Sequence, residues 1–115
     1  MKNKIKDGKT MNYTASADIS SGDLVVVGVR VGVAAADIAN GAVGVLEMEG
    51  VFELPKVTGA ITQGALVYWD ADGTPVGGVS GDGGLTTSTS GNTLAGYAVE
   101  AAGETAATVK VKLNA

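Results

Sequence analysis

The sequence predicts a small all-β protein, either a β-barrel or a β-sandwich, with an extended N-terminal arm and a long loop rich in Gly, Ser and Thr. Several short segments alternate apolar and polar residues at the two-residue period of a half-buried strand. No segment keeps the period of an amphipathic helix. The chain has 18 glycines among 115 residues, which suits short strands joined by frequent turns. These patterns together favour an all-β fold.

The composition of the chain bounds its organisation. A length of 115 residues is enough for one domain, which we place at residues 11–115 after an arm at residues 1–10. Hydrophobic residues make up 45% of the chain but aromatic residues only 4%, so we expect an aliphatic core. There is no Cys and no His, which excludes disulfides and removes the commonest general base and metal ligand. No apolar run has the length of a membrane span, and no signal peptide is found, so no membrane partner is expected.

The first ten residues form a basic arm ahead of an acidic body. The lysines of this arm are Lys2, Lys4, Lys6 and Lys9. Two interpretations stay open, namely a solvated terminus or an arm that docks on an acidic partner surface. The remaining chain is acidic, and its aromatic residues do not interleave with basic ones, which argues against binding to nucleic acid.

The strongest strand signal is at residues 24–33, LVVVGVRVGV, which we predict to be a single central strand. Its predicted inward face is an unbroken series of valines: Val25, Val27, Val29, Val31 and Val33. Gly28 and Gly32 fall on the opposite face. Because glycine weakens a strand, these two positions predict a bend or the close approach of another backbone.

A turn motif, Ile-x-x-Gly-x-(Leu/Val), occurs at residues 19–24, 38–43 and 61–66. Each copy places two small or polar residues before a Gly that can adopt positive φ, and an apolar run follows. We expect each Ile to anchor its turn. The irregular spacing of the copies indicates repeated turn chemistry and not a solenoid repeat.

The other strand candidates are residues 11–17, 44–54, 65–69, 93–101 and 105–113. Residues 44–54 alternate throughout, which predicts one long strand or a hairpin with a bulge at Gly50, buried on one side and wet on the other. Residues 73–92 form the long Gly/Ser/Thr-rich loop, with one weak strand near residues 85–88. A loop of this length in a small domain is either functional or mobile.

The last two strand candidates each carry a prediction about facing. In residues 93–101, strict alternation places Ala95, Tyr97 and Val99 on one face. In residues 105–113, Lys110 and Lys112 point outward while aliphatic residues point inward. Outward lysines suit an exposed sheet edge, where charge discourages stray pairing.

Patterns of catalytic or ligating residues are weak. Glu47, Glu49 and Glu53, at even spacing on a strand, indicate a solvated face more readily than an acid–base pair. Residues 70–73 begin like a calcium loop, but the later ligands are missing, so we predict a turn. Residues 81–88 lack the Gly-Lys-Ser/Thr element of a phosphate-binding loop. We therefore predict no catalytic, cofactor-binding or metal-binding residues, and no enzymatic activity.

Four phrases and the terminal VKVKLNA carry a family resemblance; the phrases lie at residues 13–28, 48–56, 61–70 and 91–102. On these residues the chain resembles the capsid cement, or decoration, proteins of tailed bacteriophages. The resemblance implies a β body on the outer surface of the virion, assembled in the host cytoplasm, that binds the major capsid protein and forms a homotrimer. It supplies no catalytic residues. Some members of this family have carried a recombinase-like label, but the nucleotide-binding loop that this label needs is missing here.

We predict capsid contacts at the arm, the long loop and one aromatic side chain. The predicted contact residues are Lys2, Lys4, Ile5, Lys6, Trp69, Gly78 and Asp82. If Leu66 faces the core, alternation turns Trp69 outward, where it either anchors an interface or covers the end of the barrel. An alternative function is a carbohydrate- or host-surface-binding ornament on the virion, because Gly/Ser/Thr-rich loops and an exposed Trp also suit sugar contact.

Overall fold

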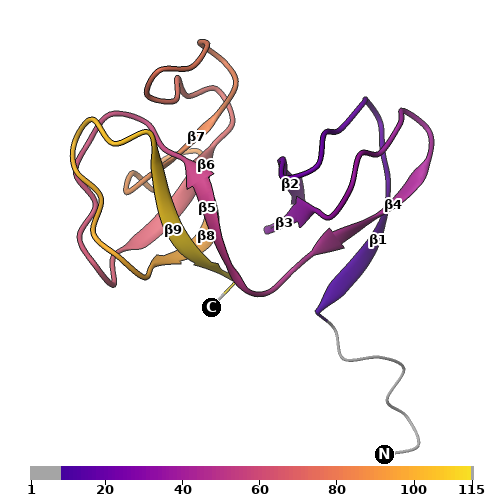
Figure 1. Ribbon diagram of the computed structural model, residues 1–115, viewed down its shortest axis with the longest axis horizontal. Helices are drawn as coiled ribbons and strands as arrows, with labels where there is room; N and C mark the ends of the chain where they lie inside the picture. Colours follow the sequence, from indigo (N-terminus) through magenta and orange to yellow (C-terminus); the bar gives the residue numbers. More distant parts are fainter. Residues whose placement is uncertain (1–8, 115) are drawn as a thin grey trace, which may run out of the picture.

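Two antiparallel β-sheets pack against each other in this protein (Figure 1). The computed structural model describes residues 9–114, and within that range the regular secondary structure is entirely β-strand. The all-β prediction is therefore confirmed. Of the two predicted architectures, residues 9–114 show packed sheets, and no closed barrel is found among them. In the same range, no helix has the length and apolar character needed to cross a membrane.

The first sheet contains four strands from the N-terminal part of the chain, in the spatial order β1-β4-β3-β2. They are β1 (Thr10–Thr14), β2 (Leu24–Val27), β3 (Arg30–Ala34) and β4 (Val43–Glu47). One face of this sheet carries a small core of its own. The buried residues of that core are Ala15, Val25, Ala34, Ile38, Leu46 and Met48.

The second sheet contains five strands in the order β5-β9-β8-β6-β7. They are β5 (Val51–Pro55), β6 (Leu66–Asp70), β7 (Gly84–Thr86), β8 (Thr93–Ala98) and β9 (Thr108–Leu113). The larger core lies on its inner face and also includes Val31 and Val33 of β3. These two valines therefore join the sheets, and the chain passes between the sheets through residues 48–50 (Figure 1).

The prediction of one central strand at residues 24–33 is wrong, because this stretch is the β2–β3 hairpin. Gly28 adopts a φ of 61° in the turn, and the neighbouring Val29 is 81% exposed. The reversal at Gly28 also divides the valines. Those of β2 at positions 25 and 27 face the small core, whereas those of β3 at positions 31 and 33 face the large core. The predicted bend at Gly28 is thus confirmed, and Gly32 is packed tightly against the side chains of β4 and Met48.

The repeated turn motif forms the same turn three times. Its glycines, Gly22, Gly41 and Gly64, have φ values of 89°, 81° and 84°. In each copy the amide after the Gly donates to the carbonyl oxygen three residues earlier, at 2.9–3.1 Å. The first two copies lie side by side, since Ile19 and Ile38 exchange two backbone hydrogen bonds of 2.8 Å. The expectation of positive-φ turns is therefore confirmed.

Residues 44–54 alternate between buried and exposed as predicted, but they form neither one strand nor a hairpin. β4 pairs with β1 and β3 in the first sheet, whereas β5 pairs with β9 in the second. Gly50, with a φ of 117°, lies in the connection. The period of two is preserved across this break because both flanking strands bury the same side of the chain.

The facing predicted for residues 105–113 is confirmed within β9, which buries Val109, Val111 and Leu113 and exposes its lysines. It is wrong for Ala107, which precedes the strand and is exposed. The prediction that this strand lies at a sheet edge is wrong, because β9 lies between β5 and β8.

In β8, the prediction that Ala95 and Tyr97 share one face is also wrong. The register with β6 shifts between Val67 and Tyr68, so Ala95 and Ala98 are both fully buried while Tyr97 lies opposite Lys112. A bulge of this kind reverses the alternation beyond it.

Asn114 fastens the end of β9 to the first sheet. Its Nδ2 donates to the carbonyl oxygens of Val31 at 2.8 Å and Met48 at 2.7 Å. The backbone of Asn114 has a φ of 53°, a conformation that Asn tolerates better than most residues. One side chain thus ties together β3, the connection between the sheets and the end of the second sheet.

Replacing Asn114 by Asp is expected to destabilise the protein by about 2 kcal/mol, because a carboxylate oxygen would face two carbonyl oxygens in place of their donor. Asn114→Gly is the control, since it also accepts positive φ but introduces no repulsion. Urea unfolding followed by circular dichroism should rank wild type above Asn114→Gly and Asn114→Gly above Asn114→Asp. Equal stability of the Asp variant and the wild type would contradict the role of this tie.

Candidate functional site

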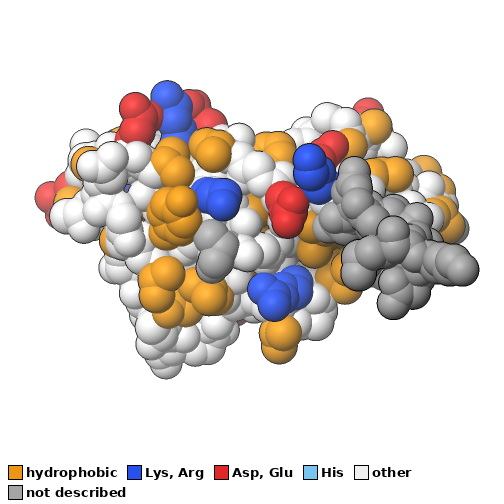
Figure 2. Space-filling view, turned by 90° about the horizontal axis from the view of Figure 1, so that it is seen from below, with side chains coloured by type: hydrophobic (Ala, Val, Ile, Leu, Met, Phe, Trp, Pro, Cys, Tyr) orange, Lys and Arg blue, Asp and Glu red, His pale blue; other side chains and the backbone are white. Residues whose placement is uncertain are grey.

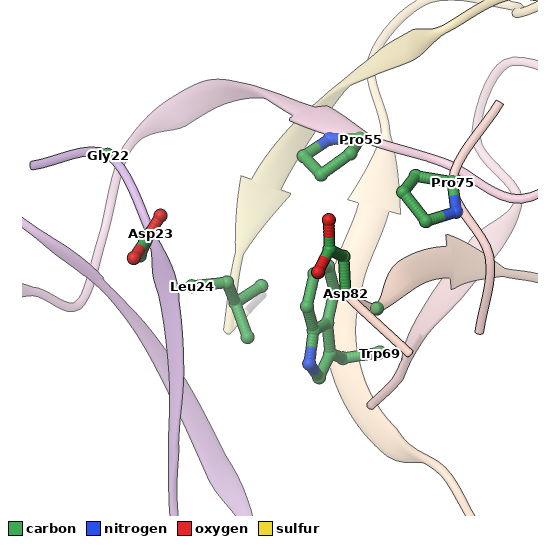
Figure 3. A pocket seen from close by; sticks show the side chains of 8 residues that line it. Gly22, Asp23, Leu24, Pro55, Trp69, Pro75 and Asp82 are labelled. Atoms are coloured by element: carbon green, nitrogen blue, oxygen red, sulfur yellow. The ribbon is translucent and has the colours of Figure 1, made fainter. Parts of the chain in front are cut away.

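A hollow of about 500 Å³ opens between the two sheets. Figure 3 shows Leu24, at the start of β2, and Trp69, on β6, on opposite sides of this hollow, with Pro55 and Pro75 near its top. Its lining includes the side chains of Asp23, Leu24, Pro55, Trp69, Pro75 and Asp82. The hollow therefore depends on the packing of both sheets and is absent from either sheet alone.

Trp69 is held by the strands on both sides of β6. It lies opposite Leu85 of β7 and Thr93 of β8. The prediction that Leu66 faces the core is wrong, because Leu66 is 51% exposed and Val67 is fully buried. The side chain of Trp69 lies on the same face of β6 as that of Val67. One part of the indole therefore packs on the large core, and another part faces the hollow.

Glycine at position 83 makes room for the indole. Its φ is +91°, and a Cβ added there would overlap the ring of Trp69, with the Cε2 atom only 3.0 Å away. The backbone of Gly83 thus lies directly against the ring. This contact fixes the position of Trp69 from the loop side, as the strands fix it from the sheet side.

The long loop is bound to the second sheet at several points. Pro75 is buried and forms a bridge with Val57, and the amide of Val76 donates to the carbonyl oxygen of Lys56 at 2.9 Å. Further along, the amide of Gly83 donates to the carbonyl oxygen of Gly73 at 2.9 Å. The predicted weak strand is confirmed as β7. These bonds bring Asp82 to the hollow, 13 positions beyond Trp69 in sequence.

The surroundings of Trp69 are acidic. Asp23 and Asp82 line the hollow, and no Lys or Arg from the described part of the chain lines it with them. A second hollow of about 440 Å³ also borders Trp69 and contains Asp70 and Asp72. Within residues 9–114, no group of three or more His, Cys, Asp or Glu residues is arranged to hold a metal ion.

A family model described as phage cement protein matches residues 5–113 of the chain. The chain belongs to this family. Neither the curated proteins nor the solved structures contain a match to it. Membership confirms the predicted resemblance and supports a structural, capsid-stabilising role in the virion, which points away from catalysis.

The structure brings together two of the contact residues predicted for this cement protein, since Trp69 and Asp82 line the same hollow. Gly78 lies on the same loop, where its amide donates to the carbonyl oxygen of Pro75, but it does not line the hollow. The predicted arm residues Lys2, Lys4, Ile5 and Lys6 lie outside the described residues.

Three lining residues were not among the predicted contact residues: Asp23, just before β2, Leu24 of β2 and Pro55 of β5. The turn motif placed Asp23 and Leu24 at the start of a strand, but it carried no information about which part of the second sheet faces them. Pro55 directly follows the predicted strand at residues 44–54, and nothing in that pattern points to a contact. Only the packing of one sheet on the other brings these residues together, and no local sequence pattern reports that packing.

Lys56 is the buried charged residue of the described chain. Its Nζ donates to the carbonyl oxygens of Val57 at 2.9 Å, Gly103 at 3.1 Å and Glu104 at 3.2 Å. Burial lowers the pKa of Lys56 from its ordinary value of 10.5, and the Glu104 carboxylate opposes this by raising it. With all three of its donors used by backbone, the ammonium group holds the loops at residues 57 and 103–104 together.

Proposed function

We propose that this cement protein binds the major capsid protein on the outer surface of a phage head, as a homotrimer, and stabilises the head after assembling onto it in the host cytoplasm. The family match over residues 5–113 carries this proposal. The hollow with Trp69 supports it, because a partly buried Trp beside a pocket is a common anchor of protein–protein contacts.

Exposed apolar side chains also support an adhesive role. Val29 is 81% exposed, and Val43 and Val79 are each 67% exposed. On the face seen in Figure 2, apolar side chains lie among separate basic and acidic groups. Mixed surfaces of this kind are usual in protein–protein interfaces. A cyclic trimer would repeat one contact around its axis, and many such contacts on a lattice would raise the effective affinity.

Adding the purified protein to undecorated heads tests the proposal. We expect saturable binding and a higher temperature of head disruption. Sedimentation of the free protein should give the mass of a trimer of the 11.3 kDa chain. Heads that remain undecorated at every protein concentration, with an unchanged disruption temperature, would contradict the proposed function.

Removing residues 1–8 tests the basic arm. Lys9 is kept because its carbonyl oxygen accepts a hydrogen bond of 2.8 Å from the Met48 amide. We expect association with the heads to slow by about tenfold at low ionic strength, because attraction to an acidic surface is lost. Replacing Lys2, Lys4 and Lys6 by Gln in the full-length chain is the control for charge alone. If both variants associate like the wild type, the arm has no role in binding.

A second candidate function is carbohydrate binding on the virion surface. The hollow of about 440 Å³ favours it, because Trp69 lies there beside Asp70, Asp72 and Asn92. An aromatic ring with nearby carboxylate and amide groups can stack on a sugar and bond its hydroxyls. A glycan array tests this function, and an array without a reproducible hit would count against it.

A further inference from the structure

We infer that the hollow of about 500 Å³ beside Trp69 binds the side chain of an arginine or lysine of the capsid partner. This inference rests on the proposed function and adds to it the chemistry of one contact. The charge, the shape and the rigidity of the hollow each favour a cationic side chain.

The charge of the hollow favours a cation. Asp23 and Asp82 line it, and no basic residue from the described part of the chain lines it or forms an ion pair with either carboxylate. The Oδ2 of Asp23 accepts a hydrogen bond from the Ser20 amide at 3.0 Å, which leaves its other oxygen free to accept another. Both carboxylates would attract an entering cation, whereas they would repel an anionic side chain.

The shape of the hollow favours a long side chain with a charged end. The indole of Trp69 forms one wall, and an indole attracts a cation placed over its face. Leu24, Pro55 and Pro75 form apolar parts of the lining. They can pack on the methylene stem of Arg or Lys while the charged end reaches the carboxylates. A planar guanidinium can stack on the indole and also bond a carboxylate, so arginine fits best.

The hollow is also ready to bind without rearrangement. Trp69 is fixed by its strand neighbours and by the backbone of Gly83. The loop that carries Asp82 is tied by the bond between the Gly83 amide and the Gly73 carbonyl oxygen, and by the bond of 3.1 Å from the Asp82 amide to Val79. Groups that are already ordered lose little entropy on binding, so a single side chain can contribute usefully.

The first test compares the wild type with the double variant Asp23→Asn/Asp82→Asn in binding to undecorated heads. The side-chain oxygen of Asn at position 23 can still accept a hydrogen bond from the Ser20 amide. We expect the double variant to bind about tenfold more weakly, with a weaker dependence on salt and an unchanged melting temperature. The control is Glu53→Gln/Glu100→Gln, which removes one exposed carboxylate on β5 and another just after β8, and it should bind like the wild type. Equal affinity of the wild type and the Asp double variant would overturn the inference.

The second test probes the hollow directly, so that it is decisive even if the wild type fails to bind heads and the proposed function falls. Trp69 is the single Trp of the chain, so its indole N–H resonance reports on this site alone. Titration with N-acetyl-arginine amide should shift that resonance in the wild type but not in the Asp double variant. N-acetyl-citrulline amide, which has a similar shape without the charge, should shift neither. A shift produced by neutral oligosaccharides and not by the arginine probe would overturn the inference in favour of a sugar site.

Discussion

Replacing Gly96 by Ala is expected to destabilise the protein by about 3 kcal/mol or more, because overpacking and an unsuitable backbone conformation act together. Gly96 has a φ of 155° and lies in β8 between β6 and β9. A Cβ at this position would overlap the carbonyl oxygen of Lys112 and lie 2.9 Å from its carbonyl carbon. Both atoms are backbone atoms of the neighbouring strand, so the strand pairing itself must shift to admit a methyl group.

Urea unfolding measures this effect, and Gly103→Ala is the matched control. Gly103 is exposed, and a Cβ added there meets no atom within 4 Å. The control should therefore unfold within about 0.5 kcal/mol of the wild type. If Gly96→Ala unfolds at the same urea concentration as Gly103→Ala, the close approach of β8 and β9 does not exist in solution.

Replacing Lys56 by Met should cost about 2–4 kcal/mol of folding free energy, because it removes the three hydrogen bonds that the ammonium group donates to part-buried carbonyl oxygens. The loss should appear as a lower urea midpoint with an unchanged slope. Lys110→Met is the matched control, because Lys110 is exposed and pairs with Glu100 at 2.9 Å on the surface. Surface pairs of this kind contribute little, so the control should remain close to the wild type.

The pH dependence of the same pair of proteins gives a second test of Lys56. Its folded-state pKa is lowered from 10.5 by burial, so between the lowered pKa and 10.5 the unfolded chain binds more protons than the folded one. Stability contributed by Lys56 therefore rises with pH in that window. The difference in unfolding free energy between the wild type and Lys56→Met should grow as the pH approaches 10.5. A difference that shrinks over this range would mean that the ammonium is not desolvated.

Local features of the fold were accessible from the sequence. The three copies of the turn motif predicted positive φ at Gly22, Gly41 and Gly64, because the requirement for glycine is set within four residues. The alternation in β9 predicted its inward aliphatic and outward lysine residues, since a period of two depends only on the strand itself. The family phrases led to the cement family for the same reason, being contiguous stretches of chain.

Features set by distant neighbours were not accessible. The hairpin at Gly28 and a single continuous strand have nearly the same pattern of valines, and only the pairing of β2 with β3 distinguishes them. The outward prediction for Trp69 depends on Leu66 being the inward residue of its strand. The order of the strands and the packing of one sheet on the other decide which residue is buried, and the alternation of β6 permits either choice.

The passage between the sheets at residues 48–50 has a consequence for how the chain folds during synthesis. Every strand of the first sheet lies before residue 48 and every strand of the second lies after residue 50, so each sheet is built from one continuous stretch. The first sheet, whose own core is largely independent of the second, can form while the ribosome is still translating the rest. Its face with Val31 and Val33 is then available for the later strands to pack against, and the bonds of Asn114 can form only after those strands have been made.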